Sequence, residues 1–441
     1  MEFSKEQQIA FDKYVNGDNI FITGPGGSGK SQLIKKINEH AILNSKIIYV
    51  TALTGCAALL LNCKAKTLHS WAGIGLGNSP IETLITKIKK NKFTKTIWRT
   101  TDILVIDEIS MLSLKLFDML NEIGQVIRGN KLPFGGIQLI LSGDFYQLPP
   151  VGDKTDIDTQ RFCFESEQWT KIFPLDCQIK LIKIFRQTDN VYSTILNEIR
   201  EGKIRKKSYE LLLKYVGREY SADLIVEPTK LYPTRSKVDE ININKMSSLQ
   251  TEERIYDIMY VKNGEMTKTE KAIRLQFSEK EIQHEFEYMS NNLLCEKTFK
   301  AKIGAHVMCI INIKAGDGTS LVCNGSQGII TSYCGVTGCP IVKYNNGIEL
   351  IMHKNIWLSD KIPGVGVSQI PLILSWALTI HKSQGATLDA AEIDVGNNIF
   401  ECGQTYVALS RVKSLDGLYL KSFDINKICI NKKVKEFYET K

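Results

Sequence analysis

The sequence predicts an α/β fold built on buried strands, and three observations predict it. Residues 24–31 read GPGGSGKS, which fits the phosphate-binding pattern G-x-x-x-x-G-K-[ST] at every fixed position. The apolar run 103–106 ends in two acids, Asp107 and Glu108, as a strand leading to a phosphate site does. Another apolar run at 370–377 starts a second α/β pattern late in the chain. We therefore expect more than one α/β domain.

Composition limits the classes of protein that fit. A chain of 441 residues is long enough for about two or three domains. Its 43% hydrophobic and 24% charged residues are typical of a soluble globular protein, and no apolar run approaches the roughly 18 residues of a membrane span. The net charge of +8 permits nucleic-acid binding without requiring it. Eleven cysteines without a secretory signal predict reduced thiols, so we expect an intracellular, soluble protein of the cytoplasm, or of the nucleus or a viral replication site.

The phosphate-binding loop has the expected neighbours. Residues 19–23 favour a short buried strand, and residues 32–37 have helical apolar spacing. Lys30 can reach the β- and γ-phosphate oxygens, and the Ser31 hydroxyl can bind Mg²⁺. The other predicted nucleotide-binding residues supply backbone N–H groups around the phosphates: Gly24, Gly26, Gly27, Ser28 and Gly29. We expect ATP and Mg²⁺ as cofactors; the alternative is a structural Gly-rich turn.

Four further side chains fit ATP chemistry. Gln7 lies upstream of the loop, and its amide can both donate to and accept from adenine, although it could equally belong to a helix cap at Ser4. We assign Asp107 to the metal and Glu108 to the attacking water. Gln147, after the predicted strand 137–144, can sense the γ-phosphate as a neutral amide.

Two stretches of the first half have residues suited to a single nucleic-acid strand. The segment 51–58, which includes Thr54, combines small and hydroxyl residues at the carboxyl end of the predicted strand 46–50. The segment 67–75, TLHSWAGIG, offers hydroxyl, imidazole and indole groups. His69 is the candidate DNA contact there, and packing is the alternative for His69 and Trp71.

The second half alternates between two patterns. Residues 251–299 are charged and poorly periodic, with a helix expected at 279–292 and no chemistry assigned. Short β-runs between 305 and 351, with a hairpin signal at Asn345-Asn346-Gly347, predict a small β-barrel. An apolar strand at 370–377 then returns the chain to the α/β pattern. His306 and His353 are interpreted as structural.

Ordered motifs along nearly the whole chain resemble the Pif-type DNA helicases of superfamily one, group B. The motifs that carry this resemblance are TLHSWAGIG (67–75), the stretch 126–138 ending in PFGGIQ, GDFYQLPP (143–150), LIKIFRQ (181–187), LYPTR (231–235), ALTIHKSQGATL (377–388) and GQTYVALSRV (403–412). The loosest match is 251–370. The related RecD-like and Dda-like groups remain alternatives, but the motif at 133–138 favours the Pif type.

The resemblance implies two RecA-like motor domains with a β-barrel insertion in the second. The expected bounds are 1–175 for the first, including a small wedge insertion, 176–250 with 371–441 for the second, and 251–370 for the insertion. The implied activity is ATP-driven 5′→3′ movement on single-stranded DNA and separation of duplexes. The implied partners are single-stranded and forked DNA, with no membrane and a monomeric free protein.

Donor side chains in the second domain are candidates for phosphate contacts. Residues that follow the predicted strand 370–377 each offer a donor to a DNA backbone, and Phe134 belongs to the 133–138 motif. The predicted DNA-binding residues are Thr54, His69, Phe134, His381, Lys382, Ser383, Gln384 and Thr387. Arg186 and Arg411 are candidates for the γ-phosphate, because a guanidinium fork matches phosphate oxygens.

Two other classes of function stay open. A P-loop kinase acting on a small acceptor would leave the second domain unexplained. A binding module without catalysis would require loss of Lys30, Asp107, Glu108 or Arg411, and all four are present.

Overall fold

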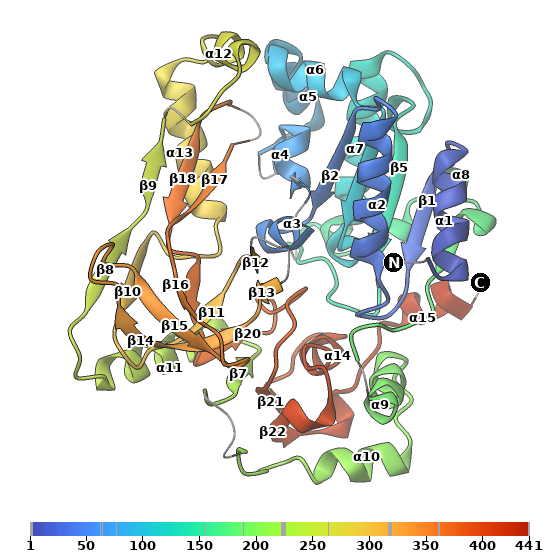
Figure 1. Ribbon diagram of the computed structural model, residues 1–441. Helices are drawn as coiled ribbons and strands as arrows, with labels where there is room; N and C mark the ends of the chain where they lie inside the picture. Colours follow the sequence, from blue (N-terminus) through green and yellow to red (C-terminus); the bar gives the residue numbers. More distant parts are fainter. Residues whose placement is uncertain are drawn as a thin grey trace. The chain divides into compact units, whose positions relative to one another are not determined.

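Figure 1 shows the computed structural model, which describes residues 3–61, 63, 65–75, 77–153, 155–187, 189–221, 226–262, 264–315, 320–359 and 362–439. These residues form two compact units. The first comprises Met1–Tyr209, Ile399–Ser410 and Asp424–Lys441, and the second comprises Glu210–Asn398 and Arg411–Phe423. In the described part of the chain, no helix has the length and apolarity that crossing a membrane takes.

A six-stranded parallel sheet forms the centre of the first unit. Its order is β3-β2-β4-β5-β1-β6. The strands are β1 (Ile20–Thr23), β2 (Ile48–Ala52), β3 (Lys66–Thr67), β4 (Ile103–Asp107), β5 (Gln138–Gly143) and β6 (Gln178–Lys180). The strands predicted at 19–23, 46–50, 103–106 and 137–144 are therefore confirmed, with ends shifted by one or two residues.

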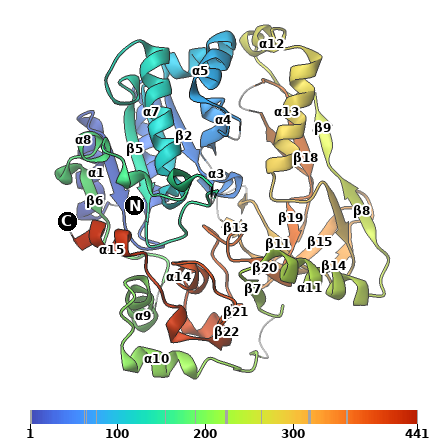
Figure 2. The same ribbon diagram turned by 180° about the vertical axis from the view of Figure 1, so that it is seen from behind.

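Helices cover both faces of this sheet. One face packs on α1 (Lys5–Val15), α2 (Lys30–Leu43) and α3 (Gly55–Leu61). The other packs on α4 (Leu68–Ala72), α5 (Ile81–Lys90), α6 (Lys92–Thr100), α7 (Leu114–Arg128), α8 (Trp169–Ile172) and α15 (Lys432–Glu439). Helices α9 (Asn190–Arg200) and α14 (Gln404–Leu409), which pack on each other, also belong to this unit. Helix α2 lies in front of the sheet in Figure 1, and α7 lies in front in the reverse view of Figure 2.

Alternation along the strands explains the two layers. On β4, Leu104 and Ile106 pack in the core that includes α7, whereas Ile103 and Val105 pack in the core that includes α2. Successive side chains of a strand point to opposite faces, so a strand buried on both faces needs a continuous apolar run. That requirement is why the pattern 103–106 predicted a central strand correctly.

The parallel register places the chemistry at one edge of this sheet. Asp107, at the end of β4, pairs with Ala52 at the end of β2, and Gly143 of β5 pairs with Thr23 of β1. The phosphate-binding loop follows Thr23 directly. Ligands of open α/β sheets bind at the carboxyl ends of the strands, and the predicted site residues of this unit begin there.

The second unit contains a four-stranded parallel sheet in the order β20-β7-β21-β22. Its strands are β7 (Thr229–Tyr232), β20 (Ala377–Thr379), β21 (Ala391–Val395) and β22 (Leu418–Phe423), with α11 (Arg235–Ser248) packed against β20 and β7. Helix α10 (Lys206–Leu213) spans the boundary of the units. The two stretches predicted to share a domain both contribute to this sheet. The compact units are defined by contacts and do not test the predicted domain bounds, which stay a prediction.

Antiparallel sheets fill residues 254–374. One has five strands, β16-β15-β14-β11-β19; the others pair β10 with β8, β12 with β13, and β17-β18-β9. The elements are β8 (Arg254–Asp257), β9 (Met259–Val261), α12 (Lys268–Arg274), α13 (Glu279–Asn292), β10 (Thr298–Ala301), β11 (His306–Cys309), β12 (Ile313–Lys314), β13 (Ser320–Val322), β14 (Gln327–Tyr333), β15 (Pro340–Tyr344), β16 (Glu349–Ile351), β17 (Asn355–Leu358), β18 (Gly366–Gln369) and β19 (Leu372–Leu374). The helix at 279–292 and the hairpin at Asn345–Gly347 are confirmed, while a closed barrel stays a prediction.

The single strand predicted at 370–377 is wrong. The segment contains β19, which pairs antiparallel with β11, and the start of β20, which pairs parallel with β7. The chain changes sheet at Ser375 and Trp376, where the Ser375 N–H donates to the His306 carbonyl at 2.9 Å. The indole of Trp376 stacks on the His306 ring with centroids 5.4 Å apart, and burial lowers the pKa of His306 to about 4. These contacts support the structural interpretation of His306.

Candidate nucleotide site and nucleic-acid contacts

The loop after β1 has the geometry of a phosphate cradle. Lys30, the first residue of α2, donates from Nζ to the carbonyls of Gly24 at 2.7 Å and Pro25 at 3.0 Å, so it lies across the loop. Burial lowers the pKa of Lys30, and three nearby carboxylates, Asp144, Glu108 and Asp107, oppose this shift. A cation held among carboxylates at a helix N-terminus is placed to bind an anionic ligand.

Ser28 and Gly27 indicate that the loop is shaped for a ligand. The Ser28 hydroxyl is buried and has no hydrogen-bond partner among the described residues. A Cβ at Gly27 would lie 2.4 Å from Cβ of Arg186, and the residue has φ +83°. Only glycine fits this close approach and this backbone conformation. The unsatisfied hydroxyl and the glycine backbone suit the oxygens of a phosphate.

The two acids at the end of β4 differ in conformation. Asp107 is the last residue of the strand and is 6% exposed. Burial, and then the nearby Glu108 carboxylate, raise the pKa of Asp107 to about 7. Glu108 follows with φ 55° and ψ 42°, the left-handed region that non-glycine residues seldom occupy. Backbone strain of this kind persists only where the surrounding structure holds it, and it concentrates at functional sites.

A magnesium ion fits the donors at this edge. Mg²⁺ prefers hard oxygen ligands and usually takes one or two from the protein. The Asp107 carboxylate supplies an oxygen at the strand end, and the exposed Ser31 supplies a hydroxyl in the first turn of α2. A divalent cation would also offset the repulsion between the Asp107 and Glu108 carboxylates.

Gln7 lies against the phosphate-binding loop. Its Nε2 donates to the Gly29 carbonyl at 3.4 Å, while its Oε1 accepts from the Ser4 N–H at 2.9 Å. The amide thus belongs to the capping box of α1 and contacts the loop, so both interpretations of Gln7 agree with its position. The Phe185 ring lies beside the same glycine, about 3.3 Å from where its Cβ would be.

Arg186 lies against the loop as well. Its Nη1 donates to the Ser410 carbonyl at 3.2 Å, and burial lowers its pKa. The neighbouring Phe185 N–H donates to the Gly27 carbonyl at 2.8 Å, which fixes this segment on the loop. From α14, the Tyr406 hydroxyl accepts from the Gly26 N–H at 2.8 Å. The structure therefore brings Arg186 to the nucleotide site, together with Tyr406, which the sequence analysis did not single out.

A buried ion pair supports the segment that carries Gln147. Asp144 and Arg200 are joined by two hydrogen bonds of 2.8 Å, and their side chains are 0% and 3% exposed. The Asp144 carbonyl accepts from the Gln147 N–H at 2.9 Å, so the pair lies at the start of a turn that ends at Gln147. Gln147 is buried at the carboxyl edge of the sheet, after β5. This position is compatible with the predicted phosphate sensing.

Thr54 and His69 lie after β2 and β3. The Thr54 hydroxyl accepts from the Ala57 N–H at 3.2 Å at the start of α3. His69, half-buried on α4, lines an open cavity of about 250 Å³, and burial lowers its pKa. A neutral imidazole can contact a nucleic acid by hydrogen bonding or stacking. Trp71 is fully buried, which confirms packing for that residue.

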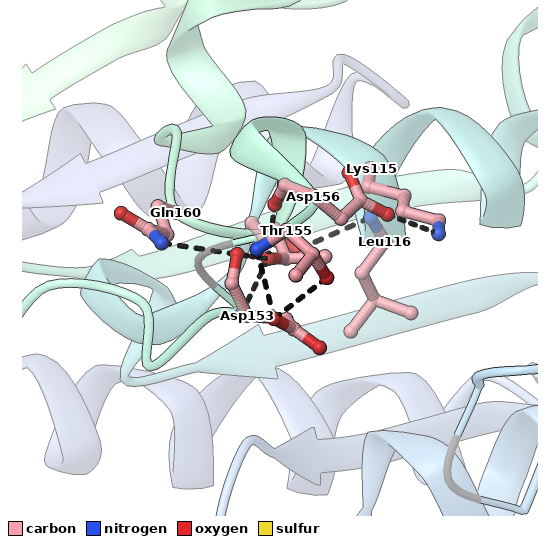
Figure 3. Close-up of polar contacts among 8 residues, drawn as sticks. Lys115, Leu116, Asp153, Thr155, Asp156 and Gln160 are labelled. Carbon is pink, nitrogen blue, oxygen red and sulfur yellow. Dashed lines mark hydrogen bonds and ion pairs between the residues drawn. The ribbon is translucent and has the colours of Figure 1, made fainter.

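The opposite wall of this cavity is formed by the segment after Pro150 and by α7. Figure 3 shows how it is held: the Asp153 carboxylate accepts from the Thr155 N–H at 2.9 Å, and Gln160 Nε2 donates to the Asp153 carbonyl at 3.0 Å. Lys115 of α7 pairs with Asp156 at 2.6 Å. The cavity is lined by Leu53, His69, Gly77, Asn78, Met111, Ser113, Lys115, Leu116, Met119, Pro150, Val151 and Thr159.

Phe134 does not face solvent. Its ring is fully buried and packs on Phe117 of α7, with ring centroids 5.3 Å apart. Its backbone has φ 50°, and it passes so close to α7 that a Cβ on Gly124 would lie 2.7 Å from it. These contacts give Phe134 a role in the core. Its assignment to DNA binding therefore stays a prediction without an exposed surface to support it.

The remaining predicted residues lie in the second unit, in the turns after β20. Lys382 is exposed and His381 is half-buried, whereas Ser383 is fully buried and donates to the Ile380 carbonyl at 2.8 Å. Gln384 is also buried, and Thr387 is half-buried. Their roles in DNA binding stay predictions, best supported by exposure for Lys382 and His381.

Arg411 belongs to the same unit and is 2% exposed. Its Nη1 lies 3.4 Å from the carbonyl oxygens of Ser383 and Ala386, and its own carbonyl accepts from the Leu388 N–H at 2.9 Å. Arg411 thus supports the 377–388 motif in the structure. Its contact with a γ-phosphate stays a prediction.

A parallel sheet with a phosphate-binding loop, a lysine and two acids at its carboxyl edge defines a P-loop nucleotide-binding protein. The family model described as "PIF1-like helicase" matches residues 2–210. The crystal structure of Pif1 helicase from Candida albicans is similar at 35% identity and a TM-score of 0.77, covering 100% of this chain and 99% of that one. The chain belongs to the PIF1-like helicase family.

Two further comparisons extend this result. The "ATP-dependent DNA helicase PIF1" of Emericella nidulans is 35% identical over 494 residues, covering 99% of this chain. The chain spans 62% of that relative's length. The crystal structure of Bacteroides Pif1 in complex with ADP-AlF3 and single-stranded DNA is 27% identical, with a TM-score of 0.66, and covers 100% of this chain and 97% of that one. The likeness to the Pif1 structures confirms the predicted family and the RecA-like α/β fold.

Proposed function

We propose that this chain is an ATP-dependent DNA helicase that moves along single-stranded DNA and unwinds duplexes. The observation that carries the proposal is the convergence of distant motifs on one phosphate-binding loop. The Tyr406 hydroxyl bonds the Gly26 N–H across 380 residues of sequence, and Arg186 lies beside Gly27. A small-molecule kinase does not need a contact between the 403–412 motif and the phosphate-binding loop, so this contact favours the helicase.

The residues of the first unit divide the chemistry among them. Lys30 and the loop backbone bind the β- and γ-phosphates, and Gln7 contacts the adenine. Asp107 and Ser31 hold Mg²⁺, which would neutralise phosphate charge when bound. Glu108 orients the attacking water and accepts its proton, while Gln147 bonds the γ-phosphate and responds to its loss.

Two arginines stabilise charge that develops on the transferred phosphoryl group. Arg186 is supported in this role by its contacts with the loop. Arg411 contributes a second guanidinium during the cycle, and because it also contacts the 377–388 motif, it links hydrolysis to the DNA-binding stretch.

DNA binding is assigned to Thr54 and His69 in the first unit and to residues 381–387 in the second. Their donors contact phosphate and sugar, which gives binding without sequence preference. The expected partners are single-stranded and forked DNA, and the relative solved with single-stranded DNA supports the first of these. We expect a monomer when free, acting in the cytoplasm, or in the nucleus or a viral replication site according to its source.

Strand displacement tests the proposal and its polarity together. Partial duplexes with either a 5′ or a 3′ single-stranded tail are mixed with the full chain, ATP and Mg²⁺. We expect the 5′-tailed duplex to open and the 3′-tailed duplex to stay closed. Opening of the 3′-tailed duplex alone would show that the protein moves in the 3′→5′ direction. If neither duplex opens, the proposed helicase function is wrong.

A further inference from the structure

The last helix of the chain, α15, packs into the core of the first unit. Val434 is fully buried, and the Phe437 ring stacks on Phe164 with centroids 4.3 Å apart. Lys433 forms an ion pair with Glu165 on the same segment. The helix is therefore held by apolar and charged contacts, and it brings the next residue, Tyr438, to the carboxyl edge of the six-stranded sheet.

The Tyr438 hydroxyl contacts the carboxyl end of β1 and the segment that follows β5. It lies 2.6 Å from the Thr23 hydroxyl and accepts from the Phe145 N–H at 3.3 Å. A phenol can accept one hydrogen bond while it donates another, so one oxygen serves both contacts. Thr23 is the last residue before the phosphate-binding loop, and Phe145 lies inside the turn from Asp144 to Gln147. The hydroxyl thus ties the loop to the segment that carries Gln147.

The Tyr438 ring also contacts the turn 144–147. It stacks on Tyr146 with centroids 4.8 Å apart and planes 13° apart. The Arg200 guanidinium lies over the Tyr146 ring at 4.5 Å and pairs with Asp144 through two bonds. Arg200 is buried and both rings are half-buried, so Arg200 and Tyr438 hold the turn 144–147 through separate contacts.

We propose that Tyr438 is a positioning residue for ATP hydrolysis, which sets the distance between the phosphate-binding loop and Gln147. The inference rests on the proposed function, because it assigns Gln147 to the γ-phosphate. Tyr438 touches neither nucleotide nor water in this scheme. Its effect is on the turnover step and not on nucleotide affinity, because Lys30 and the loop backbone keep their own contacts.

The test replaces Tyr438 with phenylalanine in the full chain, which keeps the ring and removes the hydroxyl. We expect kcat for ATP to fall about tenfold, with KM for ATP changed by less than about twofold, because only the alignment of Gln147 is lost. The Phe145 amide loses its acceptor, so its hydrogen exchange should become at least about tenfold faster. Turnover by phosphate release and amide exchange by NMR or mass spectrometry measure the two effects.

Two comparisons separate positioning from stability. Tyr14→Phe removes another tyrosine hydroxyl of the first unit, which lies 3.0 Å from His40 Nδ1, and it should leave kcat unchanged. Thr23→Val removes the partner of Tyr438. If the pair acts as one link, Tyr438→Phe combined with Thr23→Val should lower kcat no further than the stronger single variant.

Wild-type kcat and unchanged Phe145 exchange in Tyr438→Phe would overturn the inference. Equal losses of kcat in Tyr438→Phe and Tyr14→Phe would also overturn it, since they would indicate general destabilisation. Absence of ATP hydrolysis in the unmodified chain would instead refute the proposed function. The exchange comparison would then still decide whether Tyr438 holds the turn 144–147.

Discussion

Replacing Glu108 with glutamine is expected to lower ATP turnover by about 10²- to 10⁴-fold, the usual contribution of a general base. Binding of ATP with Mg²⁺ should persist, because Lys30, Ser31 and Asp107 keep their positions. The backbone conformations of the two acids agree with separate roles, since Asp107 ends the strand and Glu108 is in the left-handed region. Phosphate release gives the turnover, and titration with a fluorescent ATP analogue gives the affinity.

Two variants complete this experiment. Lys30→Ala should lose both binding and turnover, because it removes the cation that lies across the loop. Glu39→Gln, an exposed change on α2 that breaks only the ion pair with Lys36, should behave as the unmodified chain. Equal losses of ATP affinity in Glu108→Gln and Lys30→Ala would contradict the division of roles between them.

Replacing Arg411 with alanine is expected to cut DNA-stimulated turnover at least about a hundredfold. Arginine fingers contribute on the order of 10³ to 10⁵ in rate, and Arg186 would cover part of the loss. ATP affinity should fall much less, because the loop supplies most ground-state contacts. Arg411→Lys should restore little, since an ammonium lacks the fork that spans two phosphate oxygens. Single-turnover hydrolysis with saturating single-stranded DNA measures these effects.

Because Arg411 is buried, its loss could also disturb the fold of the second unit. Arg218→Gln is a matched control, since Arg218 also donates to two carbonyls of that unit, Leu415 and Asp416, both at 3.2 Å. It should leave turnover unchanged. Unfolding temperatures of Arg411→Ala and Arg218→Gln, measured side by side, separate a loss of turnover from a loss of fold. If DNA-stimulated turnover in Arg411→Ala falls by less than about threefold, Arg411 does not act on the γ-phosphate and only supports the 377–388 motif.

Local pattern was enough to predict the elements that carry the phosphate chemistry. Strand β4 is buried on both faces, so its apolar run and its terminal acids are visible in sequence. The boundary between β19 and β20 was not visible, because both strands are apolar and belong to different sheets. The hydrophobic pattern shows that residues are buried in a strand, but it does not show which neighbouring strand they pair with. Residues 370–377 were therefore predicted as one strand.

Contacts between distant residues explain what the sequence analysis missed. Tyr406, Arg200 and Tyr438 reach the site through partners that lie 380, 56 and 415 residues away along the chain. Tyr406 lies in the 403–412 motif, but the motif does not show which of its residues reaches the loop, and no local pattern distinguishes Arg200 or Tyr438 from ordinary core residues. Phe134 shows the converse case: it belongs to a diagnostic motif, yet its ring is buried against α7, and its predicted DNA contact stays a prediction.

The most direct test of the central claim measures phosphate release from ATP by the full chain, with and without single-stranded DNA. Coupling between the nucleotide site and DNA binding predicts a low basal rate that rises at least about tenfold on addition of the DNA. In Lys30→Ala, both rates should vanish. A rate that single-stranded DNA leaves unchanged, or that rises only with a small phosphate acceptor, would contradict the account.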